Sequence, residues 1–520
     1  MNKKILSLLL FAFVLILSAC SSDDSSNGEA GGSTTSTPEN QSKDLTIAIG
    51  SDMLGFDIHD HSNTSTESIH QNMFDYLFKR DANDELQPML ADSYEIVNDT
   101  TLKVSLKQGV KFHNGDEFTA EDVKFSLERV AQTPTLKENP NYKQIKEVQV
   151  VDKYTVNIIT FEPEPSIIHR LSRIGSGMLP KKYIEENGWD YFLEHPIGTG
   201  PYKFVEWVRD NKIVFEKFDD YYQGDISEWD TVTFRIIPEN STRVSELLTG
   251  GVDIATNIPP ADWDRVNSNK GTSLKQEVSN RAIILKLRTT EGYPTSDVRV
   301  RQAIDYAIND GMLTEVALKG AGIPVLSIVG PGNFGHEPSL YNTFNYDLEK
   351  SKKLLAEAGY PDGFEMTLHS PKGRYLMDAE VSELIVGMLS QVGIKVKLEF
   401  MEWSNFVEMR NANKNKDAYM LGMGNSMYDA AYTADFYSAE RNVGHTDYSN
   451  PKIEELLAQS KVNMDPTTRE KQLQEIEKIA AEDTPYINLY IEEINVGVND
   501  RIDFTPTSDE MLYAPYMKLK

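Results

Sequence analysis

The first half of the chain contains many short stretches in which apolar and polar residues alternate. This period of two is typical of half-buried β-strands. It predicts strands at residues 45–49, 102–106, 202–208, 213–218, 232–237 and 282–287, with two more inside 148–159. Helices are fewer here: capping-box patterns at residues 64–67 and 119–122 each precede apolar residues at helical spacing, as far as residues 77 and 130. Residues 244–248 predict one further short helix.

Helices and strands alternate in the second half of the chain. Amphipathic helices are predicted at residues 298–318, 347–358, 378–391, 451–461 and 467–482. Strands are predicted between them at residues 364–369, 394–400, 417–423 and 486–491. The change from a strand-rich half to an alternating half predicts two α/β lobes with mixed β-sheets.

The first 20 residues read as a targeting signal. Lys3 and Lys4 precede an apolar run over residues 5–17, which suits a signal peptide and is short for a membrane span. The run ends in Leu-Ser-Ala-Cys, which resembles the lipobox of bacterial lipoproteins and makes Cys20 the expected lipid attachment point. An ordinary signal peptide with a chance cysteine is the alternative interpretation.

Residues 21–44 are rich in Ser, Gly and Thr and show no apolar periodicity, which is typical of a flexible tether. We therefore expect a signal peptide over residues 1–19 and a lipidated cysteine with its tether over residues 20–44. Two or more acyl chains anchor a protein stably in a bilayer. The expected location is the extracytoplasmic face of the cell membrane, either on a Gram-positive surface or on the periplasmic side.

Composition narrows the function classes. The chain has 520 residues, 80 acidic against 52 basic side chains and a formal net charge of −28. This charge argues against a nucleic-acid partner, because binding to phosphates needs a basic face. The mean hydropathy of −0.43 excludes a polytopic membrane protein. The single cysteine excludes a disulfide framework and leaves no thiol nucleophile once it carries lipid.

Four segments together resemble the peptide/nickel-type solute-binding proteins of ATP-driven importers, known as family 5. They are Phe-His-Asn-Gly-Asp-Glu-Phe-Thr-Ala-Glu-Asp-Val-Lys-Phe-Ser-Leu at 112–127, Ile-Gly-Thr-Gly-Pro-Tyr-Lys-Phe at 197–204, Val-Arg-Val-Arg-Gln-Ala-Ile-Asp-Tyr-Ala-Ile at 298–308 and Tyr-Ser-Asn-Pro at 448–451. They occur in the family's order and span nearly all of residues 45–520. The resemblance extends to the dipeptide- and glutathione-binding lipoproteins of the family.

This resemblance implies an α/β fold of the type II periplasmic binding protein class, with two lobes that close on a ligand about a hinge. The family layout puts lobe I at residues 45–80, 189–285 and 490–520, an inserted subdomain at 81–188 and lobe II at 286–489. It implies a monomer that captures short peptides and passes them to the permease subunits of an ABC importer. A signalling receptor of the same fold is a further possibility.

A receptor for short peptides needs a counter-charge for each end of its ligand. Arg374 and Tyr375 follow a predicted strand, where α/β folds bind ligands, and the segment is similar to one in dipeptide-binding members whose arginine holds the peptide carboxylate. Those members carry Gly-Trp after the next predicted strand; here Met423 stands where the Trp is usual, and Gly424 follows it. Asp429 is the expected partner of the ammonium group, within a segment closer to the glutathione-binding members. Surface positions for Arg374 and Asp429 are the alternative.

Four further residues are expected near the ligand. Asp52, Met53 and Asn63 lie in or just after the loop that follows the first predicted strand, at the cleft edge in this family. Arg441 is a second cation for a dicarboxylate ligand. An ordinary surface loop is the alternative for the first three.

Two other function classes stay open at this point. His59 and His61 are spaced so that they could ligate a metal, which keeps a metal-chelate (nickel) or haem carrier of the same fold possible. Scattered surface histidines are the simpler interpretation. A surface peptide hydrolase lacks any recognisable nucleophile or metal motif in this sequence. We therefore expect no catalytic residue, no resident metal and no cofactor.

Overall fold

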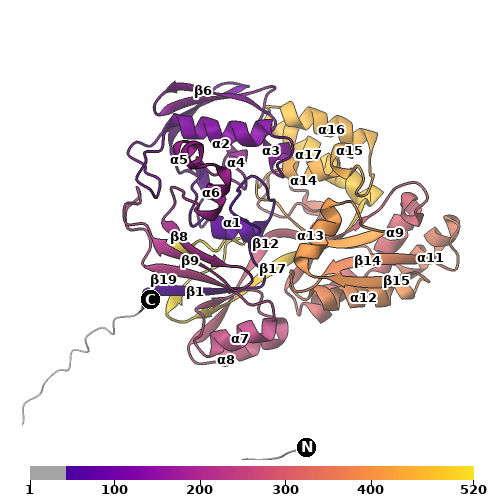
Figure 1. Ribbon diagram of the computed structural model, residues 1–520. Helices are drawn as coiled ribbons and strands as arrows, with labels where there is room; N and C mark the ends of the chain where they lie inside the picture. Colours follow the sequence, from indigo (N-terminus) through magenta and orange to yellow (C-terminus); the bar gives the residue numbers. More distant parts are fainter. Residues whose placement is uncertain (1–41) are drawn as a thin grey trace, which may run out of the picture. The chain divides into compact units, whose positions relative to one another are not determined.

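One mixed β-sheet runs through the described residues, 42–520, of the computed structural model (Figure 1). Its strands lie in the order β15 (Lys395–Met401), β14 (Glu365–Pro371), β16 (Ala418–Gly424), β12 (Thr272–Leu287), β17 (Tyr486–Asn499), β11 (Ile254–Ala255), β1 (Asp44–Ile49), β10 (Thr231–Ile236), β9 (Lys212–Lys217) and β8 (Tyr202–Val208), while β13 (Gly322–Pro324) pairs with β17. β1 is parallel to β10 and β11, and β14 is parallel to β15 and β16. The predicted signal peptide and Cys20 lie outside the described residues.

β12 and β17 carry the chain between the two halves of this sheet. Their pairing register shifts between Val278 and Ala282, and β12 pairs with β16 only beyond this break, from Arg281 on. The first crossing therefore lies at residues 279–281, slightly before the expected residue 285, and β17 crosses back near residue 492. We use lobe I for residues 43–80, 189–278 and 493–520, insert for residues 81–188, and lobe II for residues 282–491.

Lobe I is built on β1 and its neighbours. Alternate residues of β1, including Leu45 and Ile47, are buried against Phe234 of β10 and Trp229, so the expected period of two is confirmed here. The helices of lobe I are α1 (Thr64–His70), α6 (Trp189–Glu194), α7 (Asn240–Leu248) and α8 (Trp263–Ser268). A short two-stranded sheet of β18 (Ile502–Asp503) and β19 (Lys518–Leu519) lies at the end of the chain.

The insert has its own sheet and its own core. The sheet has the order β4 (Ala91–Asn98), β5 (Thr101–Leu106), β7 (Thr155–Thr160) and β6 (Ile145–Asp152). Helix α2 (Ala120–Gln132) begins after the capping box of Thr119 and Asp122, as expected, and buries Val123 and Leu127 against the sheet (Figure 1). The remaining elements near and within the insert are β2 (Phe78–Arg80), β3 (Leu86–Pro88), α3 (Asn139–Tyr142), α4 (Ile167–Arg170) and α5 (Lys181–Asn187).

Lobe II places helices on both faces of its strands. Its helices are α9 (Val298–Ala307), α10 (Asp310–Met312), α11 (Leu348–Glu357), α12 (Asp378–Ser390), α13 (Trp403–Asn411), α14 (Ala430–Ala434), α15 (Ala439–Asn442), α16 (Pro451–Val462) and α17 (Pro466–Asp483). Successive β12 residues face opposite cores: Ile283 and Leu285 belong to the core with α9 and α12, and Ala282 and Ile284 to the core with α13, α14, α16 and α17.

Two predicted helices are shorter than expected. The helix predicted at 298–318 ends at Ala307, because Asn309 has extended backbone and its side chain accepts a hydrogen bond from the amide of Met312, which starts a new turn. The helix predicted from residue 64 to 77 ends at His70. Its N-cap is Asn63, whose side chain accepts from the amide of Thr66, and not Thr64.

Candidate functional site

A cavity lies where lobe I, the insert and lobe II meet, and we call it the main cavity. Its volume is about 320 Å³. Lobe I contributes residues 60–64 and 508–511, the insert contributes Lys137, Asn141 and Ile174, and the crossing contributes Asn280 and Arg281. Lobe II contributes the largest share, which includes Lys286, Trp403, Arg410, Tyr419, Met423, Gly424, Ser426, Tyr432, Arg441 and His445. Every part of the described body therefore forms one wall of this space.

The chain reaches this cavity at the carboxyl end of β16. This strand is parallel to β14 and ends at Gly424, so the following residues, Asn425 and Ser426, leave the sheet at the edge where α/β folds bind ligands. Met423 is buried beneath this edge. The segment for which the sequence predicts ligand contact therefore lines the main cavity.

Asn63 and Arg441 also line the main cavity. Asn63 is buried and holds the start of α1, so its side-chain oxygen is already used by the amide of Thr66 at 2.8 Å. Arg441 donates to a carboxylate oxygen of Asp435 at 2.8 Å and to the side-chain oxygen of Asn141 at 2.9 Å. The second bond joins lobe II to the insert beside the cavity.

Arg374 lies at a neighbouring, smaller cavity of about 80 Å³. Its guanidinium lies 5.0 Å from the ring centre of Tyr375 and 5.4 Å from that of Trp403. The side chains of Glu492 and Glu493 line the same small cavity. Burial and the nearby Glu510 raise the pKa of Glu492 to about 7, while Arg281 and Arg374 act against this shift. The cation expected to meet a peptide carboxylate thus faces carboxylates of the chain itself.

Tyr375 is buried in the lobe II core, close to the backbone of Gly422. The two cavities are adjacent, because Thr64, Glu510 and Met511 line both of them. Arg281 binds Glu510 through two hydrogen bonds of 2.6 and 3.1 Å at this boundary. The crossing strand is thereby tied to the last segment of lobe I.

Asp52 and Met53 lie away from both cavities. Met53 is buried in the lobe I core. Asp52 accepts hydrogen bonds from the indole nitrogen of Trp207 at 3.0 Å and from the amide of Asp210 at 2.8 Å. The residue of this loop that does line the main cavity is Leu54.

Asp429 also lines neither cavity, and its carboxylate is fully used within lobe II. Arg469 donates to both of its oxygens, at 2.7 and 2.8 Å, and one of them also accepts from the amide of Ala431 at the start of α14. Both side chains of the pair are buried. This geometry replaces the expected ammonium partner by a helix cap held in a buried ion pair.

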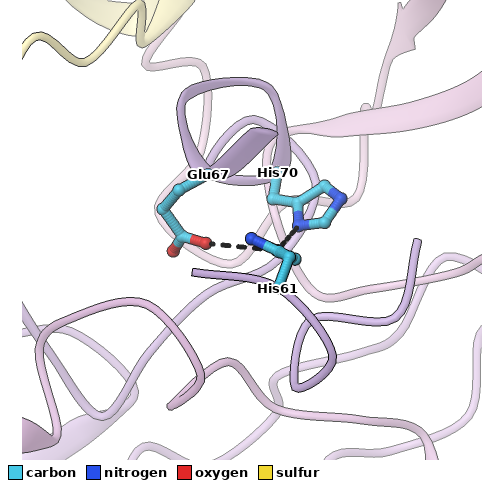
Figure 2. Close-up of side chains that lie close together, drawn as sticks. All are labelled: His61, Glu67 and His70. Carbon is cyan, nitrogen blue, oxygen red and sulfur yellow. Dashed lines mark hydrogen bonds and ion pairs between the residues drawn. The ribbon is translucent and has the colours of Figure 1, made fainter. Parts of the chain in front are cut away.

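A cluster of two histidines and a glutamate borders the main cavity (Figure 2). His61 Nδ1 accepts from the amide of Asn63 at 3.3 Å, so His61 Nε2 carries the proton and donates to His70 Nδ1 at 3.2 Å. His70 Nε2 in turn donates to the carbonyl of Gly55 at 2.8 Å. Glu67 lies 4.0 Å from His61, and all three ligand atoms lie within 4.8 Å of one another.

This cluster has the residue types of a metal site, but hydrogen bonds within the chain already use both rings. Burial lowers the pKa of His61 to about 3, which keeps its ring neutral, and raises the pKa of Glu67 to about 8. Of the two histidines that the sequence offers as metal ligands, His59 and His61, only His61 belongs to this cluster. His59 lies in another environment, with its Nδ1 2.6 Å from the guanidinium of Arg129.

Sequence reasoning missed many residues of the main cavity, among them the basic side chains of Lys286, Arg410 and His445. Lys286 carried a usable signal, since it interrupts an apolar strand, Ala-Ile-Ile-Leu-Lys-Leu at residues 282–287. A charge at a buried strand position is unusual and points to a partner or a site. Arg410 and His445 carried no such signal, because α13 and the loop after α15 meet β12 only in the folded chain.

The insert and lobe II are also joined by Arg173. Its guanidinium forms a fully buried ion pair with Glu138 at 2.6 Å within the insert. Its Nε donates to the hydroxyl of Ser426 in lobe II at 2.8 Å, and it lies 4.7 Å from the ring centre of Tyr432. Ser426 and Tyr432 both line the main cavity, so this contact closes one of its sides.

Comparison with known proteins agrees with this architecture. A family model described as bacterial extracellular solute-binding proteins, family 5 Middle, matches residues 85–445. The chain is 29% identical over 468 residues to the glutathione-binding protein GsiB of Salmonella paratyphi A, covering 88% of this chain and 90% of that one. GsiB of Escherichia coli O157:H7 is 29% identical over 463 residues, covering 87% and 90%.

Two solved structures show the same fold at a TM-score of 0.83. They are the binding protein AgaA of A. tumefaciens R10 with agropinic acid (27% identity, 92% of this chain and 99% of that one) and DppA of Helicobacter pylori with the peptide STSA (25% identity, 92% and 98%). Among the described residues, no helix has both the length and the apolar character to cross a membrane. The chain belongs to the bacterial extracellular solute-binding proteins of family 5, and it is a type II periplasmic binding protein that serves transport, not an enzyme.

Proposed function

We propose that this protein captures a short peptide, of the di-/oligopeptide or glutathione class, and delivers it to the permease subunits of an ABC importer. The observation that carries the proposal is the main cavity, whose walls come from lobe I, the insert and lobe II together. A ligand held there touches all three parts at once and so favours the arrangement in which they meet. The names of the relatives, a glutathione-binding protein and a structure with a bound peptide, support this ligand class.

The crossing of β12 between the lobes is the point about which we expect them to close on a ligand. The register break in β12 at residues 278–282 lies beside the cavity, and Asn280 and Arg281 line it directly. A break in a strand ladder is a place where backbone angles can change with little loss of hydrogen bonding. The contacts of Arg173 with Ser426 and of Arg441 with Asn141 form only when insert and lobe II are together. We assign them to the ligand-bound, closed arrangement.

Asn63, Met423, Gly424 and Arg441 are the sequence-predicted residues that we place at the ligand. Arg374 borders the adjacent small cavity, where it would meet only a part of the ligand that extends past Glu510. Tyr375 lines neither cavity and packs in the lobe II core. Asp52, Met53 and Asp429 are left out of the proposed site, since their side chains are used within the lobes.

The proposal extends to the N-terminus. A lipid on Cys20 would hold the body on the extracytoplasmic face of the membrane, within reach of the permease, and a monomer suffices because the cavity needs no second copy. The acyl chains rather than a protein helix would provide the membrane contact.

Calorimetry with di-, tri- and tetrapeptides and with glutathione tests the ligand class. Trp403 lines the main cavity, so its fluorescence provides an independent readout, with Trp403→Phe as the control for signal from the other tryptophans. We expect saturable binding of at least one peptide. No binding at millimolar concentration would overturn the proposal, and binding of nickel with histidine in place of peptide would favour the metal-chelate carrier instead.

A further inference from the structure

We propose that Lys286, Arg410 and His445 form an anion subsite in the lobe II wall of the main cavity, and that it binds a carboxylate of the ligand. This inference rests on the proposed function and makes it more specific. The ligand class is then a peptide that presents a carboxylate, from its C-terminus or from an acidic side chain, to lobe II.

Lys286 is a buried cation with no anionic partner among the residues that the structure describes. Only 6% of the residue is exposed, and it follows Ala282 and Ile284 on the β12 face that packs under α13, α14, α16 and α17. Within residues 42–520 its ammonium makes no hydrogen bond or ion pair; it lies 4.5 Å from the ring centre of Tyr486 and 5.7 Å from that of Phe436. Buried charges in proteins are normally paired, so an unpaired one that lines a cavity points to an anion from outside.

The neighbours of Lys286 are cations as well. Burial and the charges of Arg410 and Arg441 lower the pKa of Lys286 to about 7. Arg410 lies on α13 and lines the cavity, and among the described residues no carboxylate pairs with its guanidinium. Arg441 differs, because it forms an ion pair with Asp435. Asp435 also forms an ion pair with Lys461. The positive charge of this wall is therefore only partly neutralised.

Two neutral donors complete the wall. His445 has a buried Nδ1 with no hydrogen-bond partner among the described residues. Burial, with Lys286, Arg410 and Arg288, lowers the pKa of His445 to about 4, while Asp447 acts against this shift. Burial raises the pKa of Tyr419 to about 12, so its hydroxyl keeps its proton beside the cavity. A carboxylate placed here gains hydrogen-bond donors as well as positive charge.

The acidic side chains that line the cavity come from lobe I. Asp60, Asp509 and Glu510 line it from lobe I, and Glu510 is neutralised by Arg281. The cavity is therefore divided by sign, with cations in lobe II and the carboxylates of Asp60 and Asp509 in lobe I. Asp509 also accepts hydrogen bonds from the Thr507 hydroxyl and the amide of Met511. A peptide bound with its carboxylate toward lobe II and its ammonium toward lobe I would attract both lobes and so favour closure.

The subsite is tested with Ala-Ala-Ala, Ala-Glu-Ala and glutathione, each used both as the free acid and as its C-terminal amide. Calorimetry measures the affinity of wild type and of Lys286→Met for each ligand. We expect wild type to prefer the free acid, and Lys286→Met to lose about thirtyfold or more in affinity for it, since one partner of a buried charge pair is removed. If Ala-Glu-Ala amide is the one amide that binds as tightly as its free acid, the carboxylate at the subsite is an acidic side chain and not the C-terminus. Arg410→Met should lose less, about fivefold, because Arg410 is only half-buried.

Lys79→Met is the matched control. Lys79 is half-buried, but its ammonium is buried, 3.0 Å from the ring centre of Tyr513, and has no hydrogen bond among the described residues. It lines neither cavity. The variant Lys79→Met should bind every probe with the affinity of wild type. Unchanged affinity of Lys286→Met for the free acids would overturn the subsite while the proposed function stood.

If wild type binds none of these peptides, the proposed function fails, and glutarate then tests the subsite by itself. We expect millimolar glutarate to raise the melting temperature of wild type and of Lys79→Met but not that of Lys286→Met. An equal shift in all three proteins, or none in wild type, would refute an anion subsite at Lys286.

Discussion

Arg469 holds Asp429 through two hydrogen bonds, from Nη1 to Oδ2 at 2.7 Å and from Nη2 to Oδ1 at 2.8 Å. The arginine comes from α17 and the aspartate from the start of α14, so the pair fastens two helices of lobe II. The bidentate geometry is the strongest that an arginine and a carboxylate form. We therefore expect Asp429 to stabilise the fold of lobe II.

Asp429→Asn should lower the free energy of unfolding by about 3–5 kcal/mol, because it leaves a buried guanidinium without its charge partner. Urea unfolding measures the loss. The double variant Asp429→Asn/Arg469→Met should recover part of it, and peptide affinity of the folded single variant should stay within about twofold of wild type. Wild-type stability combined with lost peptide binding would return Asp429 to the ligand site.

Lys286→Met should be more stable than wild type below neutral pH. Burial lowers the pKa of this lysine from 10.5 to about 7, so between these values the unfolded chain binds one more proton than the folded chain, and wild-type stability rises with pH. Removing the lysine removes this cost. We expect an advantage of more than about 1 kcal/mol at pH 6 that shrinks toward pH 10.

Urea unfolding of both proteins at pH 6, 8 and 10 checks this sign, because other titrating groups cancel in the difference. A constant difference across this range would show that Lys286 is paired or solvated in the empty protein. The same variant is expected to lose ligand affinity, so function and stability should change in opposite directions at this position.

Ser426→Ala should weaken ligand binding without affecting the fold. It removes the acceptor of the Arg173 Nε hydrogen bond, which joins insert and lobe II and which we assign to the ligand-bound, closed arrangement. Leaving that donor unpaired costs about 1–2 kcal/mol, or five- to thirtyfold in affinity. Calorimetry and urea unfolding separate the two effects.

Ser172→Ala is the control for Ser426→Ala, since the Ser172 hydroxyl donates within the insert, to the carbonyl of His169. Its ligand affinity should equal that of wild type. Equal losses in both variants, or a loss of stability in Ser426→Ala, would argue against a contact specific to closure.

Arg374→Ala should reduce peptide affinity by less than about fivefold, well below the loss expected for Lys286→Met. Its guanidinium interacts with Glu492, which lines the same small cavity, and so already has a chain carboxylate nearby. Removing it should raise the pKa of Glu492 further above its present value of about 7. A loss in Arg374→Ala as large as in Lys286→Met would place the ligand carboxylate at Arg374.

Cys20→Ser should release the protein from the membrane fraction of cells that express it, since the proposed acyl chains are the only membrane contact in this scheme. Immunoblots of membrane and soluble fractions measure the effect. Ser33→Ala, in the predicted tether, should stay with the membrane. Membrane retention of Cys20→Ser would contradict the lipid anchor.

Much of the local structure could be predicted from the sequence. Period-two stretches such as 45–49 and 232–237 became strands, and the alternating second half became helices on both faces of parallel strands. The helix ends were harder, because a side chain such as Asn309 can start a new turn and interrupt an apolar pattern that continues past it.

By itself, the sequence determined the fold class and the family, because apolar periodicity and short motifs are local properties of the chain. It also predicted ligand contact for Met423 and Gly424 at the end of β16, and both line the main cavity. Only the tertiary structure decided how charges pair. Asp429 and Arg469 are 40 residues apart, and Lys286, Arg410 and His445 come from three separate elements. Whether a charge is free for a ligand depends on which partner the fold brings to it, and that is a long-range property that no local pattern encodes.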